Sequence, residues 1–234
     1  MDKQTTDIDV RGLTMNLLTF NRSLELCARM NYEQENLDFI DGLPENAIFY
    51  DLGSCEGRFA IYAGLKGKRV YAFEPEKDNF ETLKANITNN NLVGQVIAFN
   101  VGVGEKNEDG ILNIGQPWPG GHQKIVESTI HRSDLDFDFK TNQKIQIVGL
   151  DTFIEQNQLE NPDYLKVDID GSEIPFLKGA SKTLEKVKKL IFELNKNDEN
   201  YQNILSNLES KGLKFESEHE VPNEPNLYNI VFSR

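Results

Sequence analysis

The fold is decided by the sequence Phe49-Tyr50-Asp51-Leu52-Gly53-Ser54-Cys55-Glu56-Gly57. Its first residues end a short apolar run, which predicts a buried strand. That strand brings Asp51 to its carboxyl end, and Gly53 and Gly57 then allow a tight turn and a close approach to a ligand. A helix is predicted over residues 58–66, and ligands of open α/β sheets bind beyond the carboxyl ends of the strands. An ordinary strand-to-helix turn is the alternative, which the glycines alone do not exclude.

A second acidic residue, Glu74, directly follows the apolar run Val70-Tyr71-Ala72-Phe73. It lies about twenty residues after the glycine turn, where an acid at the end of the second strand binds ribose hydroxyls. Both oxygens of a carboxylate can accept hydrogen bonds from a vicinal diol. The alternative is an acid that favours a helix N-terminus, because Pro75 and Glu76 begin a predicted helix.

The glycine pattern distinguishes two classes of cofactor. A dinucleotide site has the pattern G-x-G-x-x-G, which brings a helix N-terminus to the pyrophosphate. Here the pattern is D-x-G-x-x-x-G, with the acid Asp51 where a phosphate-binding loop rarely has one. An acid suits a cationic ligand, and S-adenosylmethionine carries an ammonium and a sulfonium but no phosphate. The loop therefore favours S-adenosylmethionine, and a nicotinamide-dependent oxidoreductase of Rossmann type is the alternative.

The rest of the chain predicts an N-terminal helical extension over residues 1–45 and one domain over residues 46–234. Strands alternate with helices in this domain, which indicates right-handed βαβ units and a mostly parallel sheet. Residues 104–141 are predicted to be irregular, and residues 174–188 to form one helix. The last two strands have no helix between them, so they are expected to form an antiparallel hairpin at the sheet edge. The remaining strands are predicted at 95–101, 144–148, 164–167, 190–192, 215–220 and 227–232.

The chain resembles the FkbM-type methyltransferases in three blocks between about residues 47 and 195. Two blocks are the glycine turn and the second strand with Glu74. The third is Leu165-Lys166-Val167-Asp168-Ile169-Asp170-Gly171-Ser172-Glu173, with Leu177-Lys178-Gly179-Ala180 after it. Two positions depart from the family pattern, which has Asn at position 55 and Glu at position 170. The resemblance implies a class I methyltransferase fold, with a doubly wound, mostly parallel seven-stranded sheet, and S-adenosylmethionine as cofactor.

The resemblance also implies O-methylation of a small or carbohydrate acceptor. From the residues alone, a cofactor-binding scaffold without turnover remains an alternative. The predicted cofactor-binding residues are Asp51, Gly53, Cys55, Gly57 and Glu74.

A hydroxyl acceptor needs a base to remove its proton. Asp168 at the end of the fourth strand is the best-placed candidate, and His122 in the irregular stretch is a weaker one. Capping of the next helix is an alternative role for Asp168, and simple solvation is one for His122.

Two further polar residues, Glu193 and Asn195, follow the fifth strand, which should lie beside the fourth. With Asp168 they could hold a divalent cation such as Mg²⁺. Asp168 could instead act alone as the base with Glu193 orienting the acceptor. We favour this metal-free route and expect no metal site.

Composition excludes several other classes of protein. The formal net charge is −13 and no basic stripe is present, which argues against a nucleic-acid partner. No apolar run approaches the roughly 20 residues that span a bilayer. The N-terminus does not resemble a signal peptide. Cys27 and Cys55 indicate neither a disulfide framework nor a zinc site. We therefore expect a cytoplasmic enzyme with a small-molecule or carbohydrate acceptor.

Overall fold

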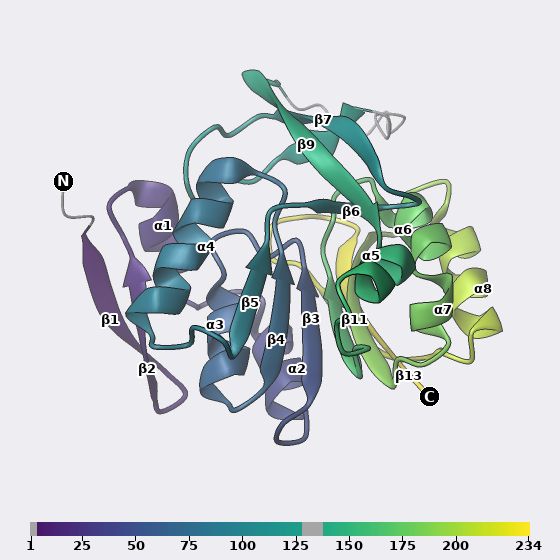
Figure 1. Cartoon of the computed structure of the whole chain (residues 1–234), viewed down its shortest axis with the longest axis horizontal. Coiled ribbons are helices and arrows are strands. Elements are labelled where there is room, and N and C mark those ends of the chain that lie inside the picture. Colours follow the sequence, from purple (N-terminus) through teal and green to yellow (C-terminus); the bar gives the residue numbers. More distant parts are fainter. Residues whose placement is uncertain (1–3, 128–137) are drawn as a thin grey trace.

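The structure is a computed structural model that describes residues 4–127 and 138–234. These residues include a seven-stranded sheet in the order β12-β13-β11-β10-β3-β4-β5 (Figure 1). β3, β4, β5, β10 and β11 run parallel, and β13 and β12 form an antiparallel hairpin at one edge. This is the predicted doubly wound sheet, with the predicted edge hairpin. The strands are β3 (Ile48–Leu52), β4 (Arg69–Phe73), β5 (Val96–Phe99), β10 (Tyr164–Val167), β11 (Lys189–Asn195), β12 (Lys214–Glu220) and β13 (Leu227–Ser233).

Helices cover both faces of this sheet because side chains alternate along each buried strand. In β3, Phe49 packs with the core on one face and Tyr50 with the core on the other. One face is covered by α2 (Gln34–Asp41), α3 (Arg58–Leu65) and α4 (Lys77–Asn89). The other is covered by α5 (Leu150–Gln156), α6 (Glu173–Gly179), α7 (Ser181–Leu184) and α8 (Tyr201–Ser210). The prediction of one helix over residues 174–188 was wrong, because the helix is interrupted at Ala180, between α6 and α7.

Residues 4–45, the described part of the predicted helical extension, are only partly helical. Residues 5–18 form a hairpin of β1 (Thr5–Val10) and β2 (Leu13–Leu18), and helices follow only at α1 (Arg22–Cys27) and α2. Arg11 and Gly12 both have positive φ, as a two-residue hairpin turn requires. The prediction of helix was wrong here, because side chains from a distant part of the chain, Asn86 and Asn90, accept hydrogen bonds from the β2 backbone and hold it as a strand. The domain boundary at residue 45 stays a prediction.

The stretch predicted to be irregular, residues 104–141, contributes instead to a second sheet. Its described strands are β6 (Gly102–Gly104), β7 (Glu108–Ile114), β8 (Lys124–Val126) and β9 (Thr141–Gly149), in the order β6-β9-β7-β8. A small core holds this sheet together, formed by Leu112, Ile114, Val126, Ile145 and Ile147. In Figure 1 the second sheet lies beyond the carboxyl ends of β3, β4 and β5.

No helix in the described ranges is both long enough and apolar enough to cross a membrane.

Candidate functional site

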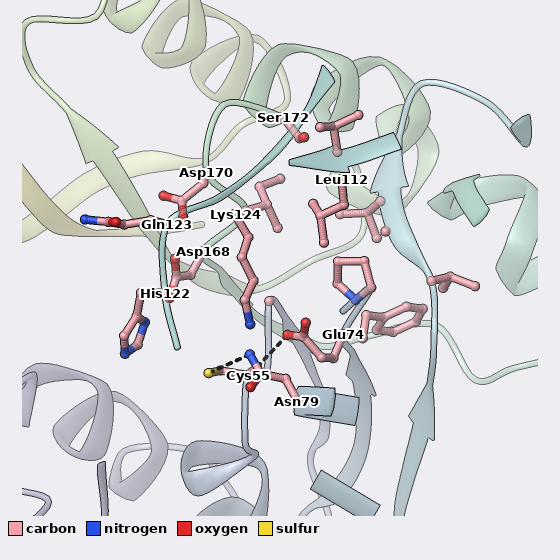
Figure 2. A pocket seen from close by; sticks show the side chains of 18 of the residues that line it. Cys55, Glu74, Asn79, Leu112, His122, Gln123, Lys124, Asp168, Asp170 and Ser172 are labelled. Carbon is pink, nitrogen blue, oxygen red and sulfur yellow. Dashed lines mark hydrogen bonds between the residues drawn. The ribbon is translucent and has the colours of Figure 1, made fainter. Parts of the chain in front are cut away.

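A cavity lies at the carboxyl ends of β3, β4 and β10, below the second sheet (Figure 2). Its lining includes five of the predicted site residues, namely Gly53, Cys55, Glu74, His122 and Asp168. The segment from Gly121 to Lys124 forms another part of its wall. The cavity is completed by apolar residues from β4, β7, β8 and the start of β6: Phe73, Pro75, Val101, Val103, Leu112 and Val126.

Glu74 directly follows β4, lines this cavity and is 4% exposed. The amide of Cys55 donates to Glu74 Oε2 at 2.8 Å, and the amide of Glu76 donates to Oε1 at 2.8 Å. Burial raises the pKa of Glu74 to about 7, although Lys124 nearby and the two amides act against this shift. Each oxygen keeps lone pairs that can accept from a ribose diol. The buried carboxylate can therefore accept hydrogen bonds from a ribose diol, and its predicted role in cofactor binding stays a prediction.

The glycines of the turn are needed mainly for packing. Gly53 has φ +82°, and a Cβ there would lie 1.7 Å from the carbonyl oxygen of Asp168. Gly57 has φ +93°, and a Cβ there would lie 2.3 Å from Leu83 Cδ1 on α4. Gly53 lines the cavity, whereas Gly57 begins α3 away from it. Both glycines thus allow a close approach to protein atoms, and the predicted close approach to a ligand stays a prediction.

Cys55 occupies the position where the family pattern has Asn. Its φ of +51° lies in the left-handed region, which Asn adopts more readily than most residues. The side-chain amide of Asn79 donates to Cys55 Sγ at 3.2 Å and to the carbonyl of Gly121 at 3.3 Å. Burial is the main cause that raises the pKa of the Cys55 thiol. Cys55 is therefore a neutral wall residue that shapes the turn.

Asp51 lies below the cavity, fully buried at the end of β3. Lys166 Nζ is 3.6 Å from Asp51 Oδ1 and 3.1 Å from Asp168 Oδ2, so the lysine bridges the two acids. Burial raises the pKa of Asp51, against the opposing effect of Lys166. Asp51 lines neither the cavity described above nor the second one described below. Asp51 can thus act on a ligand only indirectly in this geometry, through Lys166 and Asp168. Its predicted direct contact with the cofactor stays a prediction.

A second cavity adjoins the first and shares part of its wall, including Gly53, Cys55, His122 and Asp168. It extends over the ends of β10 and β11 to Glu193 and Asn195, as the adjacent strand order predicts. The loop between β12 and β13, from Val221 to Leu227, closes its far side. Two adjoining cavities that share a wall can hold two molecules side by side, which is the arrangement that group transfer between them requires.

Three carboxylates meet in the second cavity. Oxygens of Glu33, Asp168 and Glu193 lie within 4.8 Å of one another, a grouping that could hold a metal ion. Burial, with Asp168 and Glu33 as neighbouring negative charges, raises the pKa of Glu193 well above its ordinary value. Glu33 was not among the sequence-predicted site residues, because its proximity to Asp168 is created only by the fold. The expectation of no metal therefore stays a prediction.

His122 lies on the segment that borders both cavities, as Figure 2 shows beside Asp168. Desolvation by the surrounding protein lowers the imidazole pKa, even though the residue is exposed at the cavity rim. This segment is fastened to α1, because Asn21 Nδ2 donates to the carbonyl of Pro119 at 3.0 Å and Ser23 Oγ to that of Gly120 at 2.5 Å. The structure thus brings both predicted bases, His122 and Asp168, to the shared wall.

Comparison with known proteins agrees with this geometry. Residues 51–215 match the family model of the methyltransferase FkbM domain. The chain is 27% identical over 156 residues to hexuronic acid methyltransferase AglP of Haloferax volcanii, an alignment covering 67% of this chain and 59% of that protein. It is 24% identical over 206 residues to methyltransferase 1 of Beauveria bassiana, with 82% of each chain covered.

Solved structures show the same fold. The methyltransferase FkbM of Methylobacillus flagellatus KT superposes with a TM-score of 0.56 at 19% identity, over 83% of this chain and 45% of that one. TYW2 of P. horikoshii, solved with MeSAdo, superposes with a TM-score of 0.52 at 12% identity, over 99% of this chain and 70% of that one. These superpositions confirm the Rossmann-like class I methyltransferase fold. The family match, which covers most of the chain, shows that the protein belongs to the FkbM methyltransferases, whose methyl donor is S-adenosylmethionine.

Proposed function

We propose that this methyltransferase transfers the methyl group of S-adenosylmethionine to a hydroxyl of a small, carbohydrate-type acceptor held in the second cavity. The observation that carries the proposal is the position of Asp168, which lines both cavities. An acid at this shared wall can remove a proton from a hydroxyl that faces the methyl donor. The hexuronic acid methyltransferase among the relatives supports a sugar-like acceptor.

The bound cofactor supplies an electrophilic methyl group on a sulfonium, so the protein must place the acceptor and remove its proton. Lys166 Nζ donates to Asp168 Oδ2 at 3.1 Å and fixes the orientation of that carboxylate. The other oxygen, Oδ1, can then accept the hydroxyl proton. Glu193, whose pKa is raised, can hold a proton and orient a second acceptor hydroxyl. No step in this route requires a metal.

The test is methyl transfer from labelled S-adenosylmethionine to a panel of hydroxylated acceptors by wild type and Asp168→Asn. We expect Asp168→Asn to lose transfer while its affinity for S-adenosylmethionine, measured by calorimetry, stays within about threefold. Asp163→Asn is the matched control, since Asp163 immediately precedes β10, at the other end of that strand, and pairs with Lys188. An active Asp168→Asn enzyme would remove Asp168 from the mechanism. Activity lost with EDTA and restored by Mg²⁺ would replace the metal-free route with a metal-assisted one.

A further inference from the structure

The second cavity has an excess of negative charge. Six carboxyl side chains contribute to its described lining, namely those of Glu33, Asp168, Asp170, Glu173, Glu193 and Glu224. Two side chains that stay cationic at neutral pH, Arg58 and Lys166, also contribute. His122 adds no permanent charge, because its surroundings lower its pKa. Even with a proton on Glu193, the other five carboxyl groups outnumber the two cations, so the cavity presents an acceptor with mainly hydrogen-bond-accepting groups.

Both cations are already engaged by acids of the protein. Arg58 Nη2 lies 2.5 Å from Glu33 Oε2, and Arg58 Nη1 lies 3.1 Å from Glu56 Oε1. The side chains of Arg58 and Glu33 are only 8% and 9% exposed, so this pair is screened little by water. Lys166 is 5% exposed and lies between Asp51 and Asp168. An acidic group on the acceptor would have to displace one of these buried pairs to find a counter-charge among the described lining residues.

Glu33 gives the cavity this character from outside the strands of the large sheet. It precedes α2 and reaches the ends of β10 and β11, where its carboxylate meets those of Asp168 and Glu193 within 4.8 Å. It also neutralises Arg58, which would otherwise be the cation best placed to bind an acidic acceptor. Removing the charge of Glu33 would therefore make the cavity less negative by one unit and leave Arg58 paired with Glu56 alone.

We infer that the second cavity takes a polyhydroxylated or amine-bearing acceptor without carboxylate or phosphate groups, and that Glu33 is the residue that sets this selectivity. The inference deepens the proposed function and rests on it for the assignment of this cavity to the acceptor. Its physical reason is that hydroxyl and ammonium groups donate hydrogen bonds to carboxylates, whereas a desolvated anion is repelled by a lining in which carboxyl groups outnumber cations.

The test uses methyl glucoside and two probes that each differ from it in one group: methyl glucosaminide, with an amine at C2, and methyl glucuronide, with a carboxylate at C6. Binding to the enzyme saturated with S-adenosylhomocysteine is measured by calorimetry, and methyl transfer is measured by mass spectrometry. We expect the glucoside and the glucosaminide to bind at least about tenfold more tightly than the glucuronide. In Glu33→Gln the glucuronide should gain at least about tenfold relative to the glucoside, because Arg58 is partly released. Glu25→Gln, an exposed position on α1, should leave the ratio unchanged.

If Glu33→Gln does not fold, the wild-type ratio at 20 mM and 500 mM salt gives the second measurement, since charge discrimination by repulsion weakens as salt rises. A glucuronide that binds wild type as well as the glucoside does would overturn the inference, and so would failure of all three probes to bind. A glucoside that binds but is never methylated would refute the proposed function while leaving the charge selectivity intact. A glucuronide that is methylated faster than the other two probes would refute the charge selectivity while leaving the proposed function intact.

Discussion

Replacing Glu74 by Gln should separate two consequences of burying this carboxylate, one for the stability of the fold and one for the affinity for S-adenosylmethionine. The raised pKa of about 7 means that the folded protein without cofactor holds the Glu74 proton more tightly than the unfolded chain, where the pKa is about 4.5. The resulting stability is fully present below pH 4.5 and is lost as the pH rises through 7. The linkage relation gives a cost of about 3 kcal/mol at pH 8 and about 1 kcal/mol at pH 5. Gln carries no charge at either pH.

The free energy of unfolding of Glu74→Gln should therefore rise by about 2.5 kcal/mol relative to wild type between pH 5 and pH 8. Urea denaturation without cofactor, followed by circular dichroism, measures this change. Glu81→Gln on α4, whose carboxylate is half exposed beside Lys84, is the control and should show no such change. A gap between Glu74→Gln and wild type that is equal at both pH values would refute the account of this carboxylate.

The affinity of wild type for S-adenosylmethionine should rise with pH, whereas its stability falls. The ionised carboxylate is the form that accepts from ribose hydroxyls, and about a tenth of Glu74 is ionised at pH 6 compared with about nine tenths at pH 8. Wild type should bind S-adenosylmethionine roughly tenfold more tightly at pH 8 than at pH 6, whereas Glu74→Gln should bind weakly at both. Calorimetry at the two pH values checks this, and a pH-independent wild-type affinity would contradict the ribose role.

Three further substitutions test the turn and the segment above it. Gly53→Ala should lose more than about 3 kcal/mol of stability, because its Cβ would meet the Asp168 carbonyl. Gly94 also has a positive φ, +90°, but open space around it, so Gly94→Ala should lose only about 1 kcal/mol. Equal losses in urea denaturation would contradict the packing role of Gly53. Cys55→Asn should keep or slightly increase the melting temperature because Asn tolerates a φ of +51°, whereas Cys55→Val should lower it, and the reverse order would be inconsistent with a left-handed backbone. Asn79→Ala removes the acceptor that holds the Gly120 amide at 2.8 Å, so S-adenosylmethionine affinity should fall and proteolysis within residues 115–124 should accelerate; unchanged values for both would show that this anchor is dispensable.

The large sheet could be predicted from the sequence because its buried strands are short apolar runs next to glycine turns or helical patterns. The predicted strand at Tyr164–Val167 agrees with β10 at both ends. Part of the lining of the first cavity could also be predicted from the sequence, since Glu74 and Cys55 lie close to the predicted strand ends.

The N-terminal hairpin was missed because its stability depends on distant residues. The amides of Asn16 and Leu18 in β2 donate to the side chains of Asn90 and Asn86 on α4, more than sixty residues away. A local pattern contains no sign of such partners. Glu33 was missed for the same reason, because its neighbours Asp168 and Glu193 lie far along the chain and only the tertiary structure brings the three acids together. The contact of Gly53 with the end of β10 is equally non-local.

The two adjoining cavities draw their outer walls from different parts of the chain. The first cavity is lined by residues between Gly53 and Ser172, all within the span that matches the family. The second cavity also uses Tyr32 and Glu33 before that span, and residues from Val221 to Leu227 after it. If the second cavity holds the acceptor, as we propose, then substitutions in these two flanking segments should change the acceptor while the hydrogen bonds to Glu74 stay in place. The binding of the methyl donor and the choice of acceptor would then vary independently of each other.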